Sequence, residues 1–203
     1  MSATGLQAAG FVQKGNYLTV QLKQHQNFGP SQVRLQVVND QIIRVQATAE
    51  QSFRNKQSLI IVPQEGKANY KVEEQGDRLV ITTAAMRAVL NEATGQITFY
   101  DLKGQVLLNE VAQGGKTFKP FTVPDHEIGV DIAKVPEAQK HGWSWRALFD
   151  SPDNEAFYGL GQHQSEELNM KGKNEDLFQY NTKVSVPFVI SNKNYGILWD
   201  SYS

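Results

Sequence analysis

Apolar and polar residues alternate along short runs through most of the chain. In YLTVQL, Leu18, Val20 and Leu22 fall on one face of an extended strand, and polar or mixed positions fall on the other. The run VRLQVV repeats this pattern, and IIRVQA follows directly after the turn signal Asn39-Asp40. The first fifty residues therefore predict antiparallel strands that bury one face.

The same alternation continues to residue 110. The runs YKVEE, RLVITT, MRAVLN, ITFYD and QVLLNE are separated by glycine turns at Gly76, Gly95 and Gly104. Short strands at regular spacing with glycine between them are typical of an antiparallel β-sandwich. No long stretch carries the 3.6-residue apolar period of a capped helix, so we expect an all-β fold with little helix.

The pattern changes between Pro120 and His141, where proline and charged residues become frequent. We expect irregular structure there, with one or two strands. The run WSWRALFD then resumes the alternation and places Trp143, Trp145 and Phe149 on one face. We expect these aromatic side chains to fill the space between two sheets; the alternative is a platform on which a sugar stacks.

Composition excludes several classes of function. The 203 residues carry 20 basic and 21 acidic side chains, for a net charge of −1, and no basic cluster that would indicate a nucleic-acid partner. Apolar runs such as LIIVP and VPFVI are too short to span a bilayer. The absence of cysteine excludes disulfides, thiolate nucleophiles and cysteine zinc sites.

The sequence also lacks the common catalytic and cofactor motifs. A dinucleotide fingerprint fails because its third glycine is replaced by Gln164, and neither a P-loop nor a GxSxG elbow is present. The four histidines are scattered and none belongs to an HExxH helix. We therefore expect no cofactor and no metal site, and these patterns by themselves identify no catalytic residue.

The stretch FYGLGQHQ carries the strongest local signal for a site. Gly159 and Gly161 can form a sharp corner at the end of a strand, from which a loop rich in hydrogen-bonding side chains starts. Uncharged amides suit the recognition of sugar hydroxyls, although an ordinary polar loop has the same composition. The candidate loop and interface residues are Gly159, Gly161, Gln162, His163, Gln164 and Asn169. LFQYNT and VSVPFVIS then read as a hairpin pair, and the SNKNYG turn leads into ILWD.

From Phe157 to Ser203 the chain resembles the N-terminal domain of glycoside hydrolase family 31, which contains α-glucosidases and α-xylosidases. An aromatic residue precedes GLG, Lys171-Gly172 ends a short loop, and a proline-aromatic strand and a Tyr-Gly turn follow. Gln162 after GLG, the short FQYNT segment and the ending YGILWDSYS are similar to the α-xylosidase branch. The resemblance extends more weakly to GQITFYDLKGQVLLNE.

This resemblance implies a galactose-mutarotase-like β-sandwich over residues 1–203 that precedes a catalytic (β/α)₈ barrel. A barrel takes about 250 residues, so it is expected downstream and the catalytic aspartates lie outside this chain. The strand pattern close to the last residue agrees with a piece of a longer protein. The implied activity is retaining hydrolysis of a terminal α-linked xylose or glucose, in the periplasm or outside the cell.

The implied role of this domain is to buttress the barrel and to lend a loop to the sugar pocket. Matched to the family's Trp-Asn-x-Asp loop, Asn181 and its neighbour Gln179 are the residues expected at the pocket rim. The family's aspartate is not retained, so we expect a hydrogen bond to the substrate but no charge. Three alternatives stay open: a stand-alone carbohydrate-binding module, a mutarotase-like epimerase with a His acid and a Glu base, and an assembly spacer.

Overall fold

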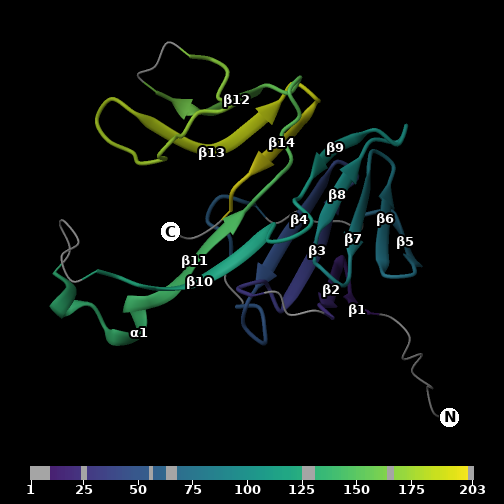
Figure 1. Cartoon of the computed structure of the whole chain (residues 1–203), viewed down its shortest axis with the longest axis horizontal. Coiled ribbons are helices and arrows are strands. Elements are labelled where there is room, and N and C mark those ends of the chain that lie inside the picture. Colours follow the sequence, from purple (N-terminus) through teal and green to yellow (C-terminus); the bar gives the residue numbers. More distant parts are fainter. Residues whose placement is uncertain are drawn as a thin grey trace.

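The protein is built almost entirely of antiparallel β-strands. The computed structural model describes residues 10–23, 27–54, 57–62, 68–124, 131–163 and 167–200. Within them, helical structure is confined to the 3₁₀ turn η1 (Ile132–Lys134) and the single turn α1 (Glu137–Lys140). The all-β fold with little helix is confirmed (Figure 1).

Two antiparallel sheets form a sandwich, and each follows chain order (Figure 1). The first sheet consists of β1 (Phe11–Lys14), β2 (Tyr17–Gln21), β3 (Gln32–Asn39) and β4 (Ile42–Thr48). The second consists of β5 (Tyr70–Gln75), β6 (Arg78–Thr83), β7 (Arg87–Asn91), β8 (Ile97–Tyr100) and β9 (Val106–Asn109). Each strand predicted from the alternation up to residue 110 is present, because short turns join sequence neighbours into meanders.

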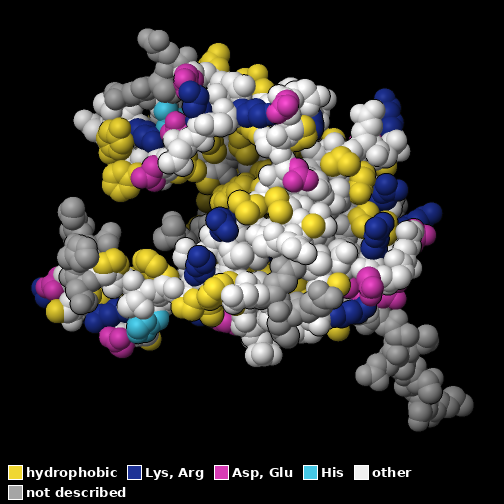
Figure 2. All heavy atoms as spheres, viewed as in Figure 1, with side chains coloured by type: hydrophobic (Ala, Val, Ile, Leu, Met, Phe, Trp, Pro, Cys, Tyr) yellow, Lys and Arg dark blue, Asp and Glu magenta, His cyan; other side chains and the backbone are white. Residues whose placement is uncertain are grey.

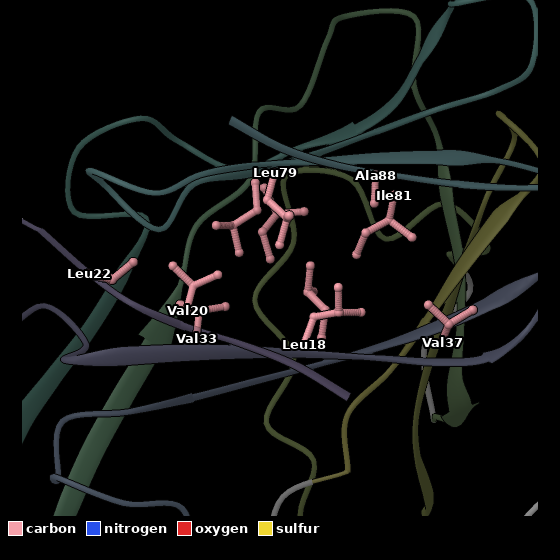
Figure 3. Close-up of a cluster of buried hydrophobic side chains, with 11 residues drawn as sticks. Leu18, Val20, Leu22, Val33, Val37, Leu79, Ile81 and Ala88 are labelled. Carbon is pink, nitrogen blue, oxygen red and sulfur yellow. The ribbon is translucent and has the colours of Figure 1, made fainter. Parts of the chain in front are cut away.

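The hydrophobic core lies between these two sheets. Figure 3 shows side chains of β2 and β3 pointing toward side chains of β6 and β7. Leu18, Leu35, Leu79 and Leu90 are fully excluded from solvent. The period-two pattern therefore predicted the buried face of the first sheet correctly.

β10 (Lys116–Thr122) and β11 (His141–Ala147) form a two-stranded ribbon that extends away from the sandwich (Figure 1). Trp143 and Trp145 remain 42% and 43% exposed, so our expectation that they fill the space between two sheets is wrong. Among the described strands β11 pairs only with β10. Trp145 instead stacks on Trp199, with ring centroids 6.4 Å apart.

A third sheet contains β12 (Phe157–Gln162), β13 (Val184–Ser191) and β14 (Tyr195–Leu198), with β13 in the middle. The hairpin predicted between LFQYNT and VSVPFVIS is wrong, because β12 and β14 occupy both edges of β13. Before β13 only an isolated bridge between Tyr180 and Lys183 forms. The predicted SNKNYG turn into ILWD is confirmed as the β13–β14 connection.

Two ion pairs join these parts to one another. Glu110 and Lys116 form a buried pair between the end of β9 and the start of β10, and Glu110 also accepts the Ile97 backbone N–H at 2.8 Å. Burial raises the pKa of Glu110 and lowers the pKa of Lys116, while their mutual attraction opposes both shifts. Arg44 on β4 contacts Asp200, just after β14, at 2.6 Å and thereby fixes the third sheet against the first.

Candidate functional site

The glycines of FYGLGQHQ lie inside β12 rather than at a corner where the strand ends. Gly159, Leu160 and Gly161 have successive φ values of 117°, 64° and 104°. Along this stretch β13 advances four residues, from Val189 to Ser185, while β12 advances two. The result is a bulge with two extra residues on β13, opposite a Leu160 backbone that departs from normal strand geometry.

Close approach of β13 is the reason that side chains are absent at both glycines. A Cβ atom on Gly159 would lie 2.6 Å from the Phe188 carbonyl oxygen, and one on Gly161 would lie 2.0 Å from the Val184 carbonyl oxygen. Both distances are far below van der Waals contact. The two glycines therefore fix the bulge by packing as well as by φ.

The remaining loop residues divide into structural and exposed positions. The Asn169 side-chain oxygen accepts hydrogen bonds from the backbone N–H groups of Phe157 and Lys171, each at 3.0 Å, so it fastens the loop to β12. Gln162 is exposed and pairs with Val184 at the end of β12. Gln164 lies outside the described residues.

His163 is turned inward. Its Nε2–H donates to the Leu160 carbonyl oxygen at 2.8 Å, which is the carbonyl that the bulge turns. Its Nδ1 lies 3.4 Å from an Oε atom of Glu175, a residue that sequence reasoning missed. His163 follows Leu160 by three positions, so the GLG-x-H spacing is the signal that could have predicted the first contact.

Gln179 and Asn181, the residues expected at a pocket rim, lie together at the exposed tip of the loop before β13. Between them in sequence, Tyr180 stacks on Phe178 with ring centroids 6.3 Å apart, and both rings are exposed. Sequence reasoning missed this aromatic pair, although the alternation of aromatic and amide residues is visible in FQYN. The tip thus presents rings and uncharged amides together.

A hollow of about 300 Å³ lies beneath this loop. Figure 2 shows hydrophobic side chains gathered in a recess between the third sheet and the β10–β11 ribbon. The lining is mostly apolar and aromatic, and Glu175 is its acidic member; it includes Phe149, Phe157, Leu177, Tyr195 and Trp199. With one carboxylate and no histidine in its lining, the hollow lacks the acid and base pair that general acid–base catalysis uses.

Glu155 is the most deeply buried carboxylate near the loop. Burial alone would raise its pKa, but hydrogen bonds from Ser191 at 2.5 Å and Tyr195 at 2.6 Å, with Lys193 nearby, outweigh burial and hold the pKa below its ordinary value. Burial also raises the pKa of the Tyr195 hydroxyl. Through its contacts with Ser191, Lys193 and Tyr195, Glu155 holds the β13–β14 hairpin against the start of β12.

Among the described residues two His–Glu pairs of the kind that an epimerase needs come together: the exposed His141–Glu137 pair, with facing atoms 2.9 Å apart, and the shielded His163–Glu175 pair. A sugar cannot lie between His163 and Glu175, because their facing atoms are 3.4 Å apart and the other imidazole nitrogen is bonded to Leu160. Among the described residues no group of three or more acidic or histidine side chains could hold a metal ion, and no helix there is long and apolar enough to cross a membrane.

Comparisons with known proteins agree on one family. Residues 32–203 match the model of the glycosyl hydrolase 31 N-terminal galactose mutarotase-like domain. The crystal structure of the family 31 α-xylosidase from Xanthomonas citri superposes with a TM-score of 0.78 and 37% identity, over 93% of this chain and 18% of that one.

Two curated relatives match at the level of sequence. An uncharacterized family 31 glucosidase of Pseudescherichia vulneris is 27% identical over 178 residues, and an α-xylosidase of Saccharolobus solfataricus is 25% identical over 185 residues. These matches cover 83% and 86% of this chain but only 32% and 23% of the relatives, so the chain spans about a third of their length or less. With its sandwich fold, the chain belongs to glycoside hydrolase family 31 and corresponds to that family's N-terminal galactose mutarotase-like domain.

Proposed function

We propose that this chain is the N-terminal domain of a retaining α-glycosidase that removes a terminal α-linked xylose, or glucose, from oligosaccharides. Relatives named α-xylosidase support xylose, and the relative named glucosidase keeps glucose as the alternative. In such a reaction one carboxylate attacks the anomeric carbon, while a second protonates the leaving oxygen and then activates water. Both belong to a catalytic barrel elsewhere in the protein, so this chain alone is inactive.

The first role of the domain is to buttress that barrel. The outer face of the third sheet carries large apolar side chains that are exposed in this chain, namely Tyr158, Val184, Val186, Phe188, Ile190 and Leu198. Cross-strand pairs such as Tyr158–Ile190 and Phe188–Leu198 make them one continuous face. A face of this kind is typical of a protein–protein contact, and the catalytic barrel is the occupant that we propose.

The second role is to supply the rim of the sugar pocket, and the tip at residues 177–182 is the observation that carries it. Phe178 and Tyr180 offer exposed rings, and Gln179 and Asn181 offer amides that can donate and accept hydrogen bonds. The tip contains no charged residue. The domain therefore contributes hydrogen bonds and stacking to the sugar, while charge comes from the barrel.

The test is kinetic and uses the full-length protein with p-nitrophenyl α-xyloside and α-glucoside. Gln179→Ala and Asn181→Ala should each lower kcat/KM by about two- to tenfold, which corresponds to the loss of one ordinary hydrogen bond. Gln105→Ala, an exposed amide in the β8–β9 turn, is the matched control and should change nothing. Unchanged kinetics in both rim variants would remove the pocket role and leave the buttress role.

The stereochemistry of the product tests the mechanism separately. The anomer released at early times, read by proton NMR before mutarotation, should be the α-sugar. Release of the β-sugar would refute retention whatever the rim variants show.

A second candidate is a stand-alone carbohydrate-binding module, which the exposed Phe178–Tyr180 pair favours. The two functions differ in what this chain does alone. Binding of xyloglucan oligosaccharides by the isolated chain at millimolar concentration or below would support the module. Absence of binding would support a pocket that only the barrel completes.

A further inference from the structure

Three side chains that can carry charge meet beneath the tip at residues 177–182. His163 follows β12, Glu175 lies in the loop, and Lys183 directly precedes β13. The same Oε atom of Glu175 lies 3.4 Å from His163 Nδ1 and 3.6 Å from Lys183 Nζ. Only 8%, 20% and 13% of these respective side chains are exposed, so the cluster is largely shielded from water.

The bulge between β12 and β13 sets the position of the imidazole in this cluster. The turned Leu160 carbonyl accepts the Nε2–H of His163, and this bond leaves Nδ1 directed at Glu175. Nδ1 is buried and has no hydrogen-bond partner in the part of the chain that the structure describes. A proton on Nδ1 would convert its contact with Glu175 from a lone pair facing a carboxylate into a donated hydrogen bond.

Lys183 connects the cluster to both ends of the tip. Its ammonium donates to the Asp176 carbonyl oxygen at 2.6 Å, and its backbone N–H donates to the Tyr180 carbonyl oxygen at 3.0 Å. The bridge between Tyr180 and Lys183 closes the turn that contains Asn181. Lys183 thus holds the chain at Asp176, just before the tip, and at Tyr180, within the tip.

We propose that His163, Glu175 and Lys183 are positioning residues that hold Gln179 and Asn181 in the geometry that meets the sugar. This inference rests on the proposed function of the tip. A shielded ion cluster adds little to stability compared with apolar packing of the same volume. The cluster instead fixes the conformation of the loop, because its hydrogen bonds to two backbone carbonyls are directional and hydrophobic contacts are not.

The central variant is Lys183→Met in the full-length protein, with Lys183→Arg as the conservative partner. Lys183→Met should raise KM for the α-xyloside by about tenfold with little change in kcat, because the tip loses its orientation and the catalytic carboxylates are untouched. Lys183→Arg should restore most of the affinity, and Glu175→Gln should reproduce the defect in part. Lys173→Met is the control, since Lys173 forms an exposed pair with Glu167 in the same loop.

Hydrogen exchange of the peptide that covers residues 175–183 gives a readout that needs no activity. Exchange should be faster in Lys183→Met than in the wild-type protein and unchanged in Lys173→Met. Equal exchange in all variants would overturn the inference. An unchanged KM in Lys183→Met, in a protein whose Gln179→Ala variant does lose affinity, would overturn it as well. If Gln179→Ala and Asn181→Ala leave the kinetics unchanged while Lys183→Met speeds exchange, the tip does not contact the sugar. The cluster would still be supported as the anchor of the tip.

Discussion

Replacement of Gly161 by alanine tests whether the GLG bulge is fixed by packing against β13. An alanine there must adopt φ near 104°, and its Cβ would lie 2.0 Å from the Val184 carbonyl oxygen and 2.9 Å from the Val186 nitrogen. The unfavourable φ costs about 1–2 kcal/mol, and displacing packed backbone costs about 1–3 kcal/mol more. We therefore expect Gly161→Ala to lower the free energy of unfolding by about 2–5 kcal/mol.

Gly76→Ala separates the two contributions. Gly76 also has a positive φ, of 65°, but nothing lies within 4 Å of its Cβ position, so only the conformational cost applies. Urea unfolding followed by tryptophan fluorescence is suitable, because Trp145 and Trp199 stack between the ribbon and the third sheet. If Gly161→Ala is no more destabilising than Gly76→Ala, close approach of β13 does not fix the bulge.

Three further predictions concern the core, the buried ion pair and pH. Leu35→Ala removes a fully buried side chain and should cost about 2–5 kcal/mol, whereas Val12→Ala, at an exposed position, should cost less than about 0.5 kcal/mol. Glu110→Gln leaves Lys116 buried without its counter-charge and should cost about 3–5 kcal/mol in urea unfolding. Folding lowers the pKa of Glu155, so the ionised carboxylate stabilises the folded protein. The difference in stability between the wild-type protein and Glu155→Gln should therefore have its full value above about pH 4.5 and should decline as the pH falls through the lower pKa of the folded state.

Each of these predictions has a result that contradicts it. Equal losses for Leu35→Ala and Val12→Ala would mean that the core does not lie between the two sheets. If Glu110→Gln is as stable as the wild-type protein, or if the double variant Glu110→Leu/Lys116→Met recovers no stability, the buried pair is not a structural link. A stability difference for Glu155→Gln that grows on acidification would reverse the sign of the pKa shift.

The strands and the core could be predicted from the sequence because alternation is a local property. Leu18 and Leu35 occupy one face through the period of two alone, whatever they pack against, and glycines with positive φ mark the turns at Gly95 and Gly104. The same reasoning placed Trp143 wrongly. Alternation shows which side chains share a face, but not whether a sheet covers that face.

The same distinction between local and tertiary information applies to the candidate site. The sequence by itself determined that glycines and amides gather near the end of the chain, and resemblance assigned Gln179 and Asn181 to a pocket rim. Only the tertiary structure decided that β13 lies between β12 and β14, that the bulge turns the Leu160 carbonyl toward His163, and that Glu175 and Lys183 meet beneath the tip. The physical reason is register: a strand's faces follow from its own residues, whereas the side chains that meet across a bulge depend on how far one strand advances past another.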